Sequence, residues 1–144
     1  MASLTYNSFH KNIMNGTIDL DTDTIKVALV LSTYTPDQDN HEFFDDVTNE
    51  HAATGNYDAG GDEIENKAVT QDDTNNWGKF DGDDVEWTSS TITNARAGVI
   101  YKDTGTAATS PLIRYHDFGE NKSTVGTTFK ITWHANGILH EVDP

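Results

Sequence analysis

The sequence predicts an all-β protein, an antiparallel β-sandwich of jelly-roll-like type with one or two short peripheral helices. Two observations carry this prediction: short segments in which apolar and polar residues alternate, and the Asp, Asn, Gly, Ser and Thr residues that separate them at short spacing. No alternation of strands with long helical segments is present, which argues against a parallel sheet. The length of 144 residues suits one domain, so we expect residues 1–144 to form a single β-sandwich.

The N-terminal segment predicts a short helix. Phe9 and Ile13 lie four positions apart, which places them on one helical face, and Gly16 follows where a helix commonly ends on a glycine. We therefore expect one or two helical turns within residues 4–14. Residues 1–16 are the candidate helical docking segment of the domain.

The first long strand is predicted at residues 24–31. Ile25, Val27 and Leu29 fall on one face of this strand and the other face is also mostly apolar, a pattern typical of a central strand. The acidic run at residues 19–23 predicts a turn before it, because Asp side chains bond their own backbone.

Two less regular segments follow. Residues 37–47 predict a short helix with acidic residues in its first turn and with Phe43, Phe44 and Val47 facing the core. Residues 48–66 are rich in Asn, Asp, Gly and Thr and show no sustained period. They predict a long surface loop with one short edge strand around Tyr57.

The rest of the chain predicts further strands. The clearest is residues 127–134, where Phe129, Ile131 and Trp133 alternate with polar residues. Asn136-Gly137 follows it and favours a type I′ hairpin, so we expect residues 138–142 to pair back onto this strand. The other strand candidates are residues 67–71, 77–80, 85–88, 91–101 and 111–118.

The composition excludes several function classes. Lys and Arg number 9 against 24 Asp and Glu, a net charge of −15, so we expect neither nucleic acid nor a membrane as partner. The absence of Cys excludes disulfides and thiol nucleophiles. Apolar runs fall well short of the roughly 20 residues that span a bilayer, and the N-terminus lacks a signal-peptide pattern. A soluble protein made in the cytoplasm is expected.

The histidines and carboxylates do not predict a metal site. No H-x-x-x-H or H-E-x-x-H spacing occurs, so we expect most histidines to be exposed or partly buried strand residues. The six are His10, His41, His51, His116, His134 and His140.

Two acidic clusters have spacings that a calcium site also shows. Asp19, Asp21 and Asp23 alternate as in an EF-hand loop, but Thr24 and Val30 stand where that loop needs Gly and Glu, which excludes an EF-hand. Ordinary turn chemistry is the favoured explanation of such clusters, so no metal and no cofactor is predicted. Whether a structural cation binds at this cluster or at the second one stays open; the second consists of Asp81, Asp83 and Asp84.

No enzyme is predicted and no catalytic residue is assigned. The chain has no nucleophile elbow, no phosphate-binding loop and no dinucleotide-binding glycine motif. Aromatic side chains offer a sugar-stacking platform as an alternative, but aromatic residues in strands more often belong to the core. The residues concerned are Trp77, Trp87, Trp133, Tyr34, Tyr57, Tyr101 and Tyr115.

Several segments resemble a recurrent family of small proteins encoded in the structural-gene regions of tailed bacteriophages and prophages. The likeness begins at N-G-T-I-D-L-D-T-D-T-I-K-V, residues 15–27, and covers nearly the whole chain. It continues through residues 34–37, 44–50, 80–85, 99–107 and 135–138. Residues 94–98 depart from the family pattern and leave the register of their strand open. The resemblance implies a virion component and supplies no catalytic residues.

Two hypotheses for the function follow from composition and resemblance together. The first is a capsid decoration, or cement, protein on the outer surface of the virion, bound to the major capsid protein and homo-oligomeric, with a trimer favoured. Residues 1–16 and the loop at 48–66 are its expected docking elements. The alternative is a tail or tail-tip component, including a host-surface glycan-binding module.

Overall fold

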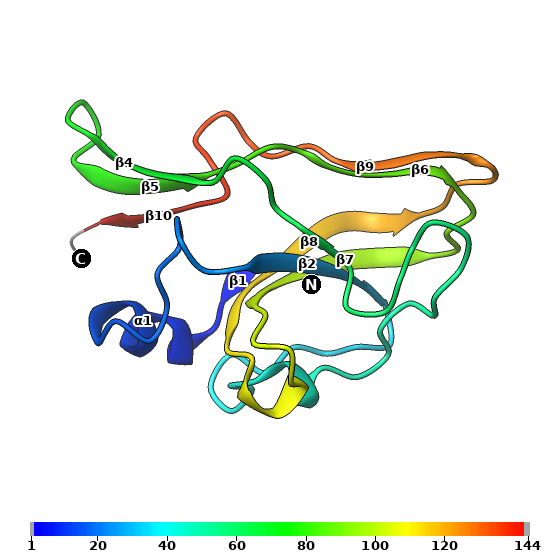
Figure 1. Cartoon of the computed structure of the whole chain (residues 1–144), viewed down its shortest axis with the longest axis horizontal. Helices are drawn as coiled ribbons and strands as arrows, with labels where there is room; N and C mark the ends of the chain where they lie inside the picture. The colour runs from blue at the N-terminus through cyan, green and yellow to red at the C-terminus, as the bar shows by residue number, and fades with distance from the viewer. Residues whose placement is uncertain (1, 143–144) are drawn as a thin grey trace.

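Antiparallel strands arranged in two layers form the framework of the protein (Figure 1). The computed structural model describes residues 2–142, so the first residue and the last two of the expected 1–144 domain lie outside the described part. One layer is a five-stranded sheet in the order β1 (Leu4–Thr5), β8 (Leu112–Lys122), β7 (Ala95–Lys102), β2 (Ile25–Leu31) and β3 (Asp62–Glu63).

The second layer holds two smaller sheets that lie end to end (Figure 1). One has the order β10 (Leu139–Val142), β5 (Trp77–Asp81) and β4 (Ala68–Asp72), and the other pairs β6 (Val85–Ser90) with β9 (Thr127–Ile131). The predicted all-β antiparallel fold is confirmed, and the two layers are consistent with a sandwich. The predicted strand segments from residue 67 to residue 134 all contain a strand, with ends displaced by a few residues.

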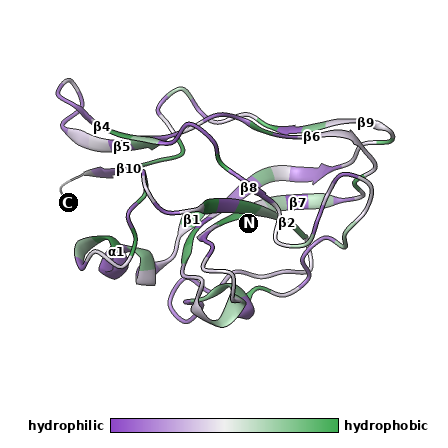
Figure 2. Ribbon diagram, viewed as in Figure 1, coloured by the Kyte–Doolittle hydropathy of each residue, from purple (hydrophilic) through white to green (hydrophobic). Residues whose placement is uncertain are grey.

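The main core lies between the two layers. Ile25, Val27 and Leu29 of β2 are fully buried there, as the alternation along residues 24–31 predicts. Phe80, Trp87 and Phe129 reach the same core from the second layer. Figure 2 shows β2 as strongly hydrophobic, whereas many of the connecting loops are hydrophilic.

A second core covers the outer face of the five-stranded sheet. Val30, Val99 and Tyr115 are buried in it, and the segments at 32–47 lie over them (Figure 1). The Phe44 ring stacks on the Tyr101 ring with centroids 4.1 Å apart. Because both faces of this sheet are covered, β2 and β7 are apolar on both sides, and the sheet forms the rigid centre of the molecule.

The predicted N-terminal helix is confirmed as α1 (Asn7–Met14). Phe9 is fully buried in the main core and Ile13 packs against that core. Gly16 follows the helix with φ +77°, a conformation that glycine adopts without steric cost. Within residues 2–142, no helix has the length and apolar character needed to cross a bilayer.

The predicted helix at residues 37–47 is wrong, because only a 3-10 turn forms there, η1 (Phe44–Asp46). The Asp37 carboxylate accepts the backbone N–H groups of residues 39 and 40 at 3.1 Å each, which satisfies them outside a helix. Phe44 N–H bonds to Ser110 O at 2.9 Å, so the segment pairs with the start of β8 instead. Of the three residues predicted to face the core, Phe44 and Val47 pack against the second core, whereas Phe43 is half-buried and belongs to neither core.

The edge strand expected around Tyr57 is also wrong. Tyr57 is fully buried in the main core, and its hydroxyl accepts the Leu29 backbone N–H at 2.8 Å. The short strand of this loop is β3, five residues later, which pairs with β2. A Cβ atom on Gly61 would lie 1.8 Å from the Val27 carbonyl oxygen, so only glycine permits this approach of the loop to β2.

The predicted 127–142 hairpin is wrong as well. β10 pairs with β5, with Leu139 opposite Phe80 and His140 opposite Lys79, and it does not return to β9. Asn136-Gly137 still forms a turn, closed by the Gly137 N–H bond to His134 O at 2.8 Å. The next residue, Ile138, donates its N–H to Phe80 O, so the turn carries the chain to β5.

The register that the sequence left open at residues 94–98 is irregular in the structure. Ala95 pairs with Lys122 and Ala97 pairs with Asp117, so β8 contains extra residues opposite Arg96. Such a bulge bends and twists its strand. The Arg96 guanidinium fixes the bulge by an ion pair to Asp117 at 2.7 Å.

Candidate functional site

The first acidic cluster closes a turn that leads into β2. Asp19 N–H donates to the Asp23 carboxylate at 2.8 Å, and Asp23 N–H donates to Asp19 O at 2.9 Å. The Asp23 carboxylate also pairs with Lys102 at 2.9 Å. A hydrogen bond between the Asp19 and Asp21 carboxyl groups lowers the pKa of Asp19 and raises the pKa of Asp21. These contacts are the turn chemistry that the sequence offered as one interpretation of this cluster.

The second acidic cluster is divided among different neighbours. Asp81 pairs with Lys79 at 3.4 Å, Asp83 accepts the Asn66 side-chain amide at 2.7 Å, and Asp84 binds the segment that follows β9. Among residues 2–142, no three His, Asp or Glu side chains converge in an arrangement that holds a metal ion.

The histidines are dispersed over the fold. His51 differs from the expectation because it is buried, with 8% of its surface exposed. Its Nε2 accepts the Thr93 backbone N–H at 3.0 Å, so the neutral ring carries its proton on Nδ1 and donates it to Ala52 O at 2.8 Å. This histidine therefore fixes two loops rather than serving as a ligand. The other five are exposed or half-buried: His10, His41, His116, His134 and His140.

Six of the seven Trp and Tyr residues considered for a sugar-stacking platform are core residues, as expected. The seventh, Trp77, is half-buried and stacks on His140 with ring centroids 3.9 Å apart. A shallow hollow of about 500 Å³ lies beside this ring. Carboxylates and amides line the hollow: Gln71, Asp72, Asp73, Asn76 and Glu141.

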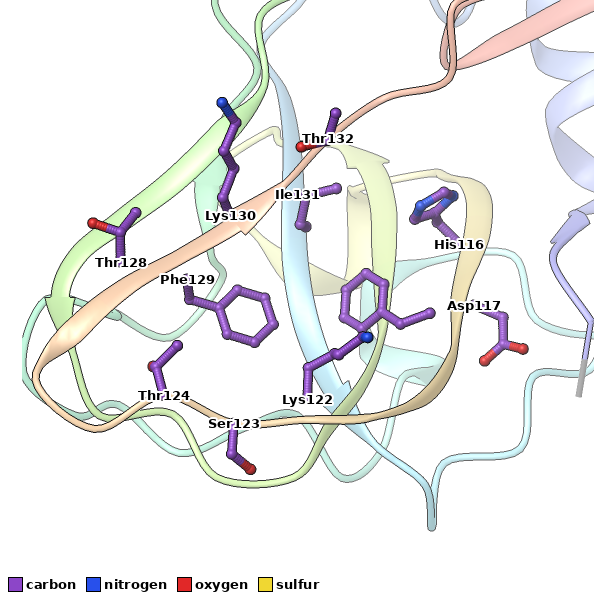
Figure 3. Close-up of a pocket in the computed structure, with 11 residues that line it drawn as sticks. His116, Asp117, Lys122, Ser123, Thr124, Thr128, Phe129, Lys130, Ile131 and Thr132 are labelled. Atoms are coloured by element: carbon purple, nitrogen blue, oxygen red, sulfur yellow. The ribbon is translucent and has the colours of Figure 1, made fainter.

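A second hollow, of about 390 Å³, lies between β8 and β9. Figure 3 shows Phe129 projecting into this space, with Lys122 and Lys130 among the polar side chains around it. Burial, together with the nearby Arg114 charge, lowers the pKa of His116 at its margin. His116 packs edge-on against Trp133 at a centroid distance of 5.3 Å, so it forms part of the wall.

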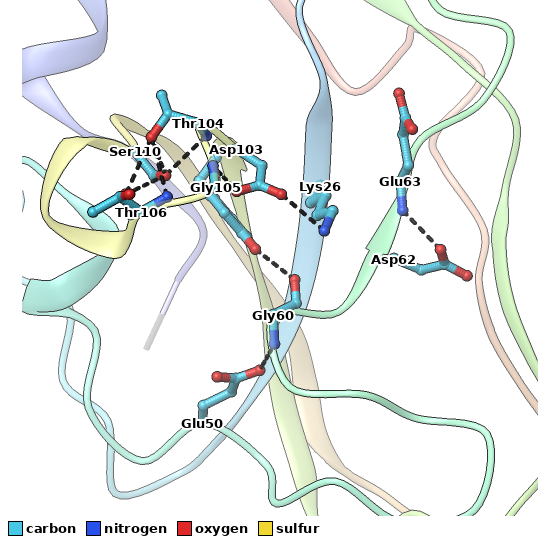
Figure 4. A network of polar contacts seen from close by, with 11 residues as sticks. Lys26, Glu50, Gly60, Asp62, Glu63, Asp103, Thr104, Gly105, Thr106 and Ser110 are labelled. Carbon is cyan, nitrogen blue, oxygen red and sulfur yellow. Dashed lines mark hydrogen bonds and ion pairs between the residues drawn. The ribbon is translucent and has the colours of Figure 1, made fainter.

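Polar contacts fix the loops at one end of the five-stranded sheet (Figure 4). Lys26 pairs with Asp103 at 2.8 Å, and the Tyr101 hydroxyl donates to Gly60 O at 2.6 Å. Hydroxyl groups at residues 104–110 bond one another around η2 (Ala107–Thr109). These bonds hold the 48–66 loop and the 103–110 loop against the sheet, which leaves little freedom for docking by rearrangement.

An apolar face lies where the end of α1 meets β4. Met14 is 86% exposed and Val69 is 50% exposed, although the chain is otherwise strongly acidic. Val69 lines a hollow of about 130 Å³, to which Ile13, the residue before Met14, also contributes. Its apolar lining consists of Ile13, Leu20, Val69, Phe80 and Leu139. We call Ile13, Met14, Val69 and this hollow the α1/β4 face.

The sequence predicted the helix of this face but not the face itself. Met14 follows Ile13 and lies outside the stripe that Phe9 and Ile13 form on one face of the helix. An apolar residue outside the buried stripe of a helix is expected to be exposed. Val69 lies in a strand whose other residues are mostly polar, and the sequence does not indicate that β4 lies beside α1.

No family model, curated protein or solved structure matches this chain.

Proposed function

We propose that this chain is a non-enzymatic structural protein of a tailed-bacteriophage virion, which decorates the outer surface of the capsid and stabilises it. The observation that carries the proposal is the α1/β4 face, where Met14 and Val69 present apolar surface on a chain of net charge −15. Exposed apolar side chains around an apolar hollow mark contact sites for other proteins. The partner is the major capsid protein, and the face lies at the end of the 1–16 docking segment.

The rigidity of the fold supports this role. Both faces of the five-stranded sheet are buried, and the long loops are bonded to it. A decoration protein stabilises a shell by adding fixed contacts between neighbouring subunits. A body with few internal degrees of freedom loses little entropy when it docks.

The weak binding expected of one copy of the α1/β4 face supports a homo-oligomer, with a trimer favoured. Burying one Met or Val side chain contributes about 1.5–3 kcal/mol, so one copy of the face gives weak attachment. A symmetric oligomer that engages several capsid subunits together converts weak contacts into stable binding. The acidic surface supports a position outside the shell, since it repels packaged nucleic acid.

Capsid binding by variants of the α1/β4 face tests the proposal. We expect Met14→Asp and Val69→Asp each to weaken binding to expanded shells of the encoding phage by about tenfold or more, because a carboxylate then enters an apolar contact. Val125→Asp is the matched control: Val125 is 81% exposed in the turn between β8 and β9, away from the face. Near-UV circular dichroism establishes that each variant is folded.

Two results would overturn this proposal. One is wild-type capsid binding by both face variants. The other is a monomeric protein that does not bind expanded shells at all.

The alternative, a tail or tail-tip module that binds host glycans, is favoured by the Trp77 hollow. A half-buried indole with adjacent carboxylates and amides resembles the stacking and hydrogen-bonding groups that hold sugar rings. Glycan-array binding that Trp77→Ala abolishes and Trp77→Phe retains would favour this function. No signal on such an array, with capsid binding intact, excludes it.

A further inference from the structure

Arg114 is an exception among the cationic side chains. The chain has 9 Lys and Arg residues against 24 Asp and Glu. Within residues 2–142, Arg114 makes no ion pair, and Lys11 is exposed on α1. The others each pair with a carboxylate: Lys26, Lys67, Lys79, Arg96, Lys102, Lys122 and Lys130. A half-buried guanidinium without an acid partner is therefore unusual in this protein.

The Arg114 side chain is also short of hydrogen-bond acceptors. Its Nη1 donates to the Thr5 hydroxyl at 3.3 Å, whereas its Nε is buried and has no acceptor among residues 2–142. Burial lowers the pKa of Arg114, and nearby carboxylates do not offset this effect. An unsatisfied donor on a buried charged group is costly, so an acceptor at this point would stabilise the folded state.

A cavity of about 300 Å³ lies beside Arg114 and has room for a group of opposite charge. It lies between β8 and the segment that joins β9 to β10. Arg114 lines it together with Thr5, His134, Asn136 and His140, and Ile138 and Leu139 supply apolar surface. Its lining contains no Asp or Glu, on a chain with 24 of them.

The other polar groups of the cavity are mostly hydrogen-bond donors. His134 Nδ1 accepts the Asn136 backbone N–H at 3.0 Å, so the neutral His134 ring carries its proton on Nε2. The Asn136 side-chain amide and the His140 ring add further N–H groups. Donors around one arginine, without a carboxylate, form the chemistry of an oxyanion site.

We propose that the Arg114 cavity binds a small oxyanion, a carboxylate or phosphate group, with Arg114 as its main ligand. The guanidinium can donate through its Nη atoms to the oxygens of either group, and binding supplies the counter-charge that Arg114 lacks. The apolar surface of Ile138 and Leu139 accommodates a short carbon skeleton beside the charged group. The Arg114 cavity and the α1/β4 face share only Leu139, so the oxyanion proposal does not depend on the capsid proposal.

Nuclear magnetic resonance of the arginine side chains tests the site. Inorganic phosphate and glucuronate are titrated separately into ¹⁵N-labelled protein at constant ionic strength. We expect a saturable shift of the Arg114 Nε–H signal with at least one probe. Arg114→Gln should weaken binding by about tenfold or more, and Arg114→Lys by less, because charged hydrogen bonds are lost in part.

The control removes the same charge elsewhere. Lys122→Gln replaces a cation of a different hollow, and its affinity for the probe should equal that of the wild type. If Arg114→Gln does not fold, Asn136→Ala keeps the test, with an expected loss of a few-fold. Saturation by phosphate alone or by glucuronate alone identifies the oxyanion. Saturation by neither, or equal binding by Arg114→Gln, overturns the proposal.

Discussion

The Asp84 carboxylate accepts the backbone N–H of Trp133 at 3.0 Å, just beyond the end of the β6–β9 ladder. The Trp133 ring N–H donates to Asp83 O at 2.9 Å, so the tryptophan is bonded through both backbone and side chain. These two bonds keep the chain after Ile131 beside residues 83 and 84, which join β5 to β6. The chain is therefore led along this segment to β5, where residues 139–142 pair instead of forming a hairpin with β9.

We expect Asp84→Ala to lower the free energy of unfolding by about 1–2 kcal/mol, because the Trp133 N–H loses a charged acceptor. Urea unfolding followed by tryptophan fluorescence measures the change. Glu86→Ala is the matched control: Glu86 also pairs with Lys130, at 3.3 Å, but its side chain is 43% exposed and accepts no backbone N–H among residues 2–142. An equal loss in both variants would contradict the role of the Asp84–Trp133 bond.

Alanine substitutions at two glycines distinguish the steric cost of an added methyl group from the cost of a positive φ. Gly61 and Gly105 have φ values of +74° and +85°, but a Cβ on Gly105 would meet nothing within 4 Å. We expect Gly105→Ala to cost about 1 kcal/mol and Gly61→Ala more than about 3 kcal/mol, because the methyl group added at position 61 would force the loop off Val27. Thermal unfolding distinguishes them. Similar melting temperatures for the two variants would contradict the close packing of the loop on β2.

His116 makes stability depend on pH. Burial, then the Arg114 charge, holds its pKa below the ordinary value of about 6.5. As the pH falls through about 6.5, the unfolded chain binds a proton there while the folded chain does not, so the free energy of unfolding decreases. This loss is complete below the folded-state pKa. Above about pH 6.5 the ring is neutral in both states and contributes no pH dependence.

We expect His116→Phe, which keeps a ring against Trp133, to reduce the loss of unfolding free energy between about pH 7.5 and pH 5.5 by up to about 1 kcal/mol. Urea unfolding at both pH values gives the difference. The same pH dependence in the variant and the wild type would show that His116 is not protected from protonation in the folded state.

The sequence predicted those elements whose patterns are local. The alternation of Ile25, Val27 and Leu29 indicated β2, and Phe9 with Ile13 indicated α1, because each pattern places its residues on one face of a single element. Turn chemistry likewise explained the 19–23 cluster. In these cases the interactions that decide the structure lie within a few residues of one another.

The errors arose where distant residues decide the structure. Asn136-Gly137 favours a hairpin locally, but Asp84, about fifty positions earlier, holds Trp133 beside the segment that leads to β5. Residues 37–47 have a helical composition, but their N–H groups bond to Asp37 and Ser110. The α1/β4 face and the Arg114 cavity are likewise assembled from segments far apart in the sequence, so no local pattern indicates them.

The proposed position on the outer surface of a capsid is tested most directly by the copy number of this chain in purified virions, measured by quantitative mass spectrometry against the major capsid protein. Decoration at repeated positions of the shell predicts hundreds of copies per virion. A handful or a few tens would contradict it and would place the protein in the tail, with glycan binding at Trp77 as the leading function.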